Sequence, residues 1–140
     1  MGFEKFGYVS YVTQTRVSEF TKYLADGKIY GSKCVECGNV EFPPRANCGR
    51  CLSGKWEWVE LTGDCKLLTF TKVDAAPAAF QDQAPYILGL AEFSEGPKVL
   101  AWIDRAVSES EVKAGVRLKL KPTNLKNGQL SYILTTSNSA

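Results

Sequence analysis

The stretch CVECGNVEFPPRANCGRC, residues 34–51, carries the most specific structural signal in this 140-residue chain. It holds two Cys-x2-Cys pairs ten residues apart, formed by Cys34, Cys37, Cys48 and Cys51. Two such pairs make two tight turns whose thiolates face one ion, as in a structural zinc site. The sequence has no histidine, so the site would have four sulfur ligands, which favour Zn2+ first and iron second. A closed four-sulfur site leaves no position for substrate, so we expect a structural metal.

Other interpretations of the cysteines are open but less favoured. Disulfides would suit a secreted chain, yet residues 1–30 lack the basic start and apolar run of a signal peptide. A thioredoxin-like site has one Cys-x2-Cys pair in a βαβ context, which this pattern does not match. Cysteines kept reduced on a metal indicate a cytoplasmic protein. Cys65 stands outside the pattern, and with no histidine to activate it we expect a strand residue.

Composition narrows the function. A hydrophobic content of 44% suits a globular domain with one core, and no apolar run reaches the length of a membrane span. A net charge of +2 is small for a nucleic-acid binder. Hydrolases and acyl-transfer enzymes often take their general base from histidine, so a self-sufficient enzyme is disfavoured. We assign no catalytic residue.

Periodicity predicts a helix followed by many strands. An apolar stripe that includes Phe20 and Leu24 recurs at helical spacing, and Gly27 is a stop signal. From Trp56 onward, alternation and turn signals predict five to six strands, with a hairpin at Asn127-Gly128. The predicted strands are 56–61, 65–73, 86–93, 99–103, 116–121 and 130–134, with a short strand in 40–45 and one helical turn in 104–113. This number of strands is typical of a small OB-type barrel.

The expected fold class is therefore mainly β. It consists of an N-terminal helix, a rubredoxin-like zinc ribbon with four cysteine ligands and a C-terminal OB-fold barrel. The expected divisions are an arm and helix at 1–31, the ribbon at 32–55, the OB-fold domain at 56–136 and a frayed tail at 137–140.

Two segments of the barrel are candidates for a functional contact. Arg117, Lys119 and Lys121 alternate with apolar residues, so one strand face carries three positive charges that suit phosphate groups. A solvated edge strand protected by lysine has the same pattern. The long, mildly apolar loop 75–85, with Phe80 near its middle, is either a contact for a ligand or partner or a flexible connector.

Aromatic residues near the N-terminus are candidates for a partner interface. Phe3, Phe6 and Tyr8 lie in a segment without sustained periodicity, which indicates a docking arm. Phe20 and Tyr23 on the predicted helix would face the same partner. The alternative is a helix packed on the core of this chain.

Several of these elements together resemble a known family. Residues 34–73 are similar to a zinc-ribbon and OB-fold family long labelled a domain of unknown function and later linked to acyl-CoA metabolism. The matching features are the cysteine pairs, the Pro43-Pro44-Arg45 between them and the Trp-Val-Glu-Leu-x-Gly run ending at Gly63. The resemblance extends over about residues 17–121. Cys65, where relatives often have a small residue, and the aromatic arm before residue 15 depart from it.

The resemblance implies a role as an accessory subunit. Members of this family assemble with thiolase-fold proteins in β-ketoacyl-CoA cleavage or formation, and the partner supplies the nucleophilic cysteine and the histidine. By this resemblance the chain binds Zn2+, bridges subunits of a thiolase-type acyl-CoA acyltransferase complex and meets acyl-CoA within that complex, away from any membrane.

Two other functions are compatible with the pattern. An OB-fold module can bind nucleic acid on aromatic platforms, for which Trp56, Trp58, Phe70 and Tyr86 are candidates. The small net charge argues against this function. A third possibility is a CoA carrier or weak thioesterase acting alone.

Overall fold

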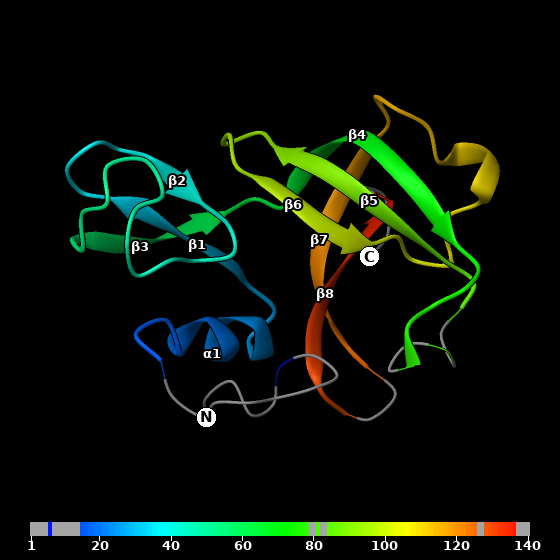
Figure 1. Cartoon of the computed structure of the whole chain (residues 1–140), viewed down its shortest axis with the longest axis horizontal. Helices are drawn as coiled ribbons and strands as arrows, with labels where there is room; N and C mark the ends of the chain where they lie inside the picture. The colour runs from blue at the N-terminus through cyan, green and yellow to red at the C-terminus, as the bar shows by residue number, and fades with distance from the viewer. Residues whose placement is uncertain (1–5, 7–14, 79–80, 82–83, 126–127, 137–140) are drawn as a thin grey trace.

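A computed structural model of the chain describes residues 6, 15–78, 81, 84–125 and 128–136. Its elements are α1 (Glu19–Ala25), β1 (Ile29–Cys34), β2 (Val40–Glu41), β3 (Trp56–Leu61), β4 (Asp64–Val73), β5 (Tyr86–Phe93), β6 (Lys98–Trp102), η3 (Glu109–Glu111), β7 (Arg117–Asn124) and β8 (Leu130–Thr136). They form a three-stranded sheet, β2-β1-β3, and a five-stranded sheet, β6-β5-β4-β7-β8. Figure 1 shows the small sheet on the left above α1 and the large sheet on the right.

The five-stranded sheet curls into a nearly closed barrel, as predicted for an OB fold. Its neighbouring strands all pair antiparallel. Just beyond β6, Ile103 bridges Leu134 of β8, and the N–H of Asp104 donates to the Leu134 carbonyl at 2.7 Å. These contacts bring the two edges of the sheet together. Leu67, Leu120 and Leu134 point inward and are fully buried, as the alternating sequence pattern requires.

Most strand predictions are confirmed with shifted ends. The strands predicted at 65–73, 86–93 and 99–103 match β4, β5 and β6 to within one residue at each end. β7 is longer than predicted because Pro122 stays in register opposite Tyr132. β2 is shorter than predicted since Pro43 and Pro44 follow it closely. Asn127 of the predicted hairpin lies outside the described residues.

Two strands of the ribbon differ from expectation. β1 was not predicted, and β3 was counted as a barrel strand. β3 instead pairs with β1 along its whole length, from Leu61 opposite Ile29 to Trp56 opposite Cys34. An alternating strand looks the same in either sheet, so only this non-local pairing decides where β3 belongs. The ribbon sheet therefore extends well beyond the cysteine pairs.

The helix packs its predicted stripe inward. Phe20, Thr21 and Leu24 are buried, and the Thr21 hydroxyl donates to the Ser18 carbonyl at 2.8 Å. Gly27 follows the helix with a φ of 80°, which favours glycine and confirms the stop signal. No helix in the described part of the chain combines the length and the apolar character needed to cross a membrane.

An aromatic cluster joins the helix, the ribbon and the barrel. We define it as Phe6, Phe20, Phe42, Phe93 and Tyr132. The Phe42 ring, from the ribbon, lies 5.7 Å from Phe20 of α1, 5.1 Å from Phe93 of β5 and 5.1 Å from Tyr132 of β8, measured between centroids. These three pairs are edge-to-face, the arrangement favoured by ring quadrupoles. Phe42 is thus the point where three parts of the fold meet.

Replacing Phe42 tests this role. Phe42→Ala leaves a cavity among rings from three elements, so we expect the free energy of unfolding to fall by about 3–5 kcal/mol. Phe70→Ala is the matched control because Phe70 is 42% exposed on β4, and its loss should stay below about 1 kcal/mol. Chemical denaturation with zinc present measures both. Equal losses would contradict the central position of Phe42.

Candidate metal centre and adjoining cleft

The first cysteine turn is built at the end of β1. Cys34 is the last residue of that strand, and the chain turns sharply through Cys37. The backbone N–H of Cys37 points at the Cys34 sulfur, with N and Sγ 3.5 Å apart. This N–H stabilises the thiolate and lowers the pKa of the Cys34 thiol.

The second turn repeats this arrangement at Cys48. The backbone N–H groups of Arg50 and Cys51 point at the Cys48 sulfur, at 3.3 and 3.5 Å, and the Asn39 amide lies 3.8 Å from it. The backbone N–H of Cys51, followed by that of Arg50, lowers the pKa of the Cys48 thiol to about 6. A thiol with this pKa is largely ionised at neutral pH and is ready to bind a cation.

The four predicted ligands converge. Every pair of their sulfur atoms lies within 4.8 Å, with Cys34 and Cys51 at 3.5 Å and Cys37 and Cys48 at 3.6 Å. Zinc with Zn–S bonds of about 2.3 Å in a tetrahedron separates its sulfurs by about 3.8 Å. All four cysteines are free, so the disulfide alternative is not realised. The sulfur geometry and the donor set fit Zn2+, which confirms the predicted cofactor.

The centre is suited to structure rather than chemistry. Cys34 and Cys48 are buried, while Cys37 and Cys51 are exposed. Four thiolates complete a tetrahedral coordination shell, and this leaves no open position for a substrate. The ion therefore ties the two turns together and fixes the end of the ribbon.

Cys65 has the structural environment that was predicted. It lies in β4, is 1% exposed, and its thiol donates to the Gly63 carbonyl at 3.4 Å. Burial raises the pKa of this thiol to about 12, so at neutral pH the reactive thiolate is scarcely populated.

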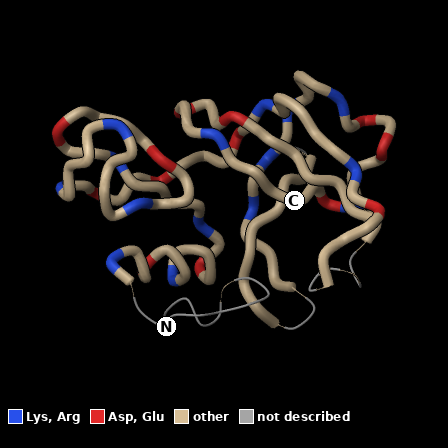
Figure 2. The backbone as a smooth tube through the Cα atoms, viewed as in Figure 1, with Lys and Arg blue, Asp and Glu red and all other residues tan. Residues whose placement is uncertain are grey.

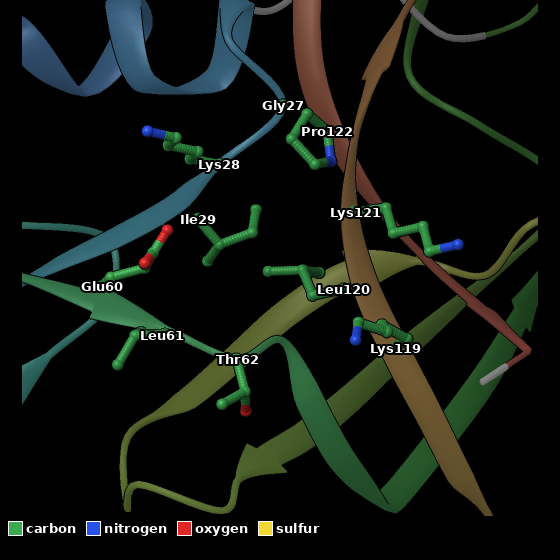
Figure 3. Close-up of a pocket in the computed structure, with 10 residues that line it drawn as sticks. All are labelled: Gly27, Lys28, Ile29, Glu60, Leu61, Thr62, Lys119, Leu120, Lys121 and Pro122. Carbon is green, nitrogen blue, oxygen red and sulfur yellow. The ribbon is translucent and has the colours of Figure 1, made fainter. Parts of the chain in front are cut away.

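A cleft of about 580 Å³ lies between the ribbon and the barrel (Figure 3). It contains two of the predicted phosphate-binding residues, Lys119 and Lys121, together with Lys28 from the chain segment before β1. Lys119 pairs with Asp64 at 3.7 Å. In Figure 3 the ammonium groups of Lys28 and Lys121 extend away from each other, so these side chains line the cleft without converging on one point.

The other candidate ligand contacts are placed differently. Arg117 is exposed on the same face of β7 but does not line the cleft. Phe80 lies outside the described residues. The prediction that basic and apolar residues alternate across β7 is correct, since Leu118 and Leu120 are buried on the opposite face.

The structure places the predicted interface residues in different environments. Phe20 is 1% exposed and belongs to the aromatic cluster, so its assignment to an exposed partner surface was wrong. Tyr23 is half-buried and stacks on Tyr30 with centroids 3.8 Å apart. Phe6 is half-buried against Phe20 and Tyr132. Phe3 and Tyr8 lie outside the described residues.

Sequence reasoning missed two features near these sites. The first is an aromatic face formed by Tyr23 of α1 with Tyr30, Trp56 and Trp58 of the ribbon, in which Trp58 lies 5.3 Å from Tyr23 and 4.9 Å from Trp56. The spacing of two in Trp56-x-Trp58 was a usable signal for one shared strand face. The second is Lys28, which no motif singles out.

Family models match most of the chain. A model described as "ChsH2, rubredoxin-like zinc ribbon domain" matches residues 21–57. A model described as "ChsH2, C-terminal OB-fold domain" matches residues 58–121.

Three curated relatives carry the same name, DUF35 domain-containing scaffold protein. The relative from Pyrococcus furiosus is 33% identical over 106 residues, covering 75% of this chain and 76% of that protein. The relative from Methanocaldococcus jannaschii is 36% identical over 76 residues, 54% of each chain. The relative from Methanothermobacter thermautotrophicus is 36% identical over 74 residues, 52% of this chain and 56% of that protein. The chain thus spans about half the length of the last two.

Two solved structures share the fold. One, titled "Ltp2-ChsH2(DUF35) aldolase", superposes with a TM-score of 0.73 at 18% identity and covers 91% of this chain and 99% of that chain. The other, from Sulfolobus solfataricus, is a protein of the DUF35 family with unknown function; its TM-score is 0.62 at 24% identity, covering 91% and 90%. At these identities the likeness shows the fold alone.

Removing one ligand tests the metal centre. Cys48→Ser should abolish the binding of one zinc per chain and lower the melting temperature, because the metal holds both cysteine turns. Cys65→Ser is the matched control and should retain zinc, since Cys65 lies away from the centre. Elemental analysis together with thermal unfolding measures both effects. Full zinc occupancy in Cys48→Ser would rule out the four-sulfur site.

Proposed function

Since the chain belongs to the DUF35 family of zinc-ribbon and OB-fold scaffold proteins, we propose that it is a non-catalytic accessory subunit of a thiolase-type acyl-CoA complex. In this role the zinc-stabilised ribbon and the barrel bridge subunits and help to hold the CoA substrate. The partner supplies the chemistry of β-ketoacyl-CoA cleavage or formation.

The observation that carries the proposal is the joining of a closed four-cysteine centre to the barrel through Phe42. The centre has the ligands of a structural metal site, and the aromatic cluster links the ribbon to β5 and β8 of the barrel. Such a chain presents two surfaces in a fixed relation, as a scaffold requires.

The sequence of the chain also favours a partner that does the chemistry. A thiolase-type reaction uses a cysteine nucleophile and at least one histidine. This sequence has no histidine, and its cysteine outside the metal centre is buried with a raised pKa. One solved relative of the same fold is titled an aldolase that pairs Ltp2 with a DUF35 chain, which supports an enzyme partner for this chain as well.

The half-buried aromatic residues supply the proposed partner surface. The aromatic face of Tyr23, Tyr30, Trp56 and Trp58 is exposed in part on α1 and the ribbon and has the tyrosine and tryptophan content favoured at interfaces. We assign Phe3, Phe6 and Tyr8 of the N-terminal arm to the same partner surface. Rigid aromatic rings lose little conformational entropy on binding, which suits a docking surface.

The cleft beside β7 is the proposed contact with the CoA phosphates. Lys119 and Lys121 line it from the barrel and Lys28 lines it from the ribbon side (Figure 3). Lysine ammonium groups sit on flexible stems, so they reorient toward a phosphate when one arrives. Arg117 extends the same basic face beyond the cleft, and Phe80 is assigned to the acyl chain.

A nucleic-acid-binding role finds less support. Of the four candidate stacking residues, Trp56 and Trp58 lie on the ribbon, and Tyr86 is buried against Trp102. Only Phe70 among them is well exposed on the barrel. Figure 2 shows Lys and Arg interspersed with Asp and Glu over both parts of the chain, whereas a single-strand binding groove is uniformly basic.

Assembly is the direct test of the proposed role. The full chain and the thiolase-type protein from the same organism should co-elute in size-exclusion chromatography when they are produced together. Cys48→Ser should abolish co-elution because the ribbon loses its metal, whereas Cys65→Ser should keep it. Separate elution of the two wild-type proteins, with thiolase activity indifferent to this chain, would refute the accessory role.

The cleft is tested through the kinetics of the complex. Replacing Lys119 and Lys121 with glutamate should raise the KM for acyl-CoA at least about fivefold at low salt, since two phosphate contacts become repulsive. Lys98→Glu is the control, because Lys98 is exposed on β6 and does not line the cleft. An equal KM in the wild type, the double variant and Lys98→Glu would refute the phosphate contact. The proposed scaffold role would be unaffected by that result.

A further inference from the structure

The two cysteine turns share one backbone hydrogen bond, and the residue that donates it differs between them. The N–H of Gly38 donates to the Cys34 carbonyl at 3.0 Å, and the N–H of Leu52 donates to the Cys48 carbonyl at the same distance. Both residues follow the second cysteine of their pair and have a left-handed φ, 78° for Gly38 and 64° for Leu52. Leucine therefore occupies the position at which the first turn has glycine.

This conformation is unfavourable for leucine. Only glycine, and to a lesser degree asparagine or aspartate, adopts a left-handed φ readily, because a β-carbon crowds the neighbouring carbonyl. Among the described residues, Leu52 is the one non-glycine residue with a positive φ. A glycine would adopt this backbone conformation with less strain, so the presence of leucine at this position needs another explanation.

The Leu52 side chain buries little of its surface in the folded chain. It is 78% exposed, the highest value among the large apolar residues that the structure describes as exposed. Val35, which follows the first cysteine of the other turn, is 60% exposed. The sulfurs of Cys34 and Cys51 lie 3.5 Å apart, so the residues that follow these two cysteines lie at the same end of the ribbon. Two apolar side chains thus project into solvent beside the metal centre.

The charged residues at this end of the ribbon indicate what kind of partner surface it can bind. Lys55 lies beside Val35, whose N–H donates to the Lys55 carbonyl, and Lys55 pairs with Glu36 at 4.0 Å. Within the described part of the chain no ion pair involves Arg50, which is exposed. An exposed arginine that forms no ion pair within the described chain is suited to a carboxylate on another protein.

We propose that the ribbon tip, defined as Val35, Arg50 and Leu52, docks into an apolar pocket with a carboxylate at its rim on the enzyme subunit. This inference rests on the proposed function. Leu52 is the anchor that enters the pocket, Val35 lies at its edge, and Arg50 pairs with the carboxylate. A protein pocket is favoured over a lipid surface because the two aliphatic side chains bury less apolar area than one acyl chain, and one acyl chain gives only marginal membrane binding.

The test separates docking from folding. Leu52→Asn and Leu52→Gly both remove the apolar side chain and both suit a left-handed φ, so their melting temperatures and zinc content should equal or exceed those of the wild type. Their Kd for the purified thiolase-type partner should rise at least about tenfold, as for a buried anchor. Arg50→Glu should also weaken binding. Leu100→Asn is the control, because Leu100 is 61% exposed on β6, and its Kd should stay within about twofold.

Each other outcome overturns the inference in a distinguishable way. Unchanged affinity of both Leu52 variants in a complex that forms would reject the docking tip and leave the proposed function intact. Loss of zinc or a lower melting temperature in both variants would make Leu52 a structural residue. Wild-type sedimentation with vesicles of phosphatidylcholine and phosphatidylserine, abolished by Leu52→Asn, would assign the tip to a membrane. Failure of the wild-type chain to bind the partner would reject the proposed function, and the docking tip with it.

Discussion

The contact of Phe42 with Phe93 and Tyr132 is the interaction on which the arrangement of this chain depends. The ribbon and the barrel each have their own sheet, and Phe42 carries the packing from one to the other. The ring also meets Phe20, which draws the helix into the same junction. Such edge-to-face packing of buried rings is both apolar and directional, so it fixes orientation as well as contact.

The metal centre complements this junction from the other end of the ribbon. Residues 34–51 include only the two-residue strand β2 and part of β1, too little regular structure to hold their shape alone. The convergence of four sulfurs supplies the missing constraint, and the N–H groups aimed at Cys34 and Cys48 favour the ionised form of these two thiols before a metal binds. Because Phe42 lies between the two cysteine pairs, metal binding and the aromatic junction constrain the same segment.

Local patterns in the sequence predicted much of this fold. Contacts between segments that are distant in the sequence could not be predicted from such patterns. The cysteine spacing predicted the metal centre because ligation depends on two short turns. Alternation predicted β4 to β8 but not the sheet of β3, since pairing with β1 joins distant segments. The helical stripe identified Phe20 without saying that this chain itself covers it. The left-handed φ of Leu52 follows from the geometry of its turn, which no residue-level pattern reveals.

These features describe a scaffold in which zinc, ribbon and barrel act as one unit. Hydrogen exchange of the full chain before and after zinc chelation tests this most directly. The account predicts that amides of β1 and β3 lose protection together with those of β5 and β8 near Phe93 and Tyr132, because Phe42 couples them. Faster exchange confined to residues 34–51, with β5 and β8 unchanged, would contradict it.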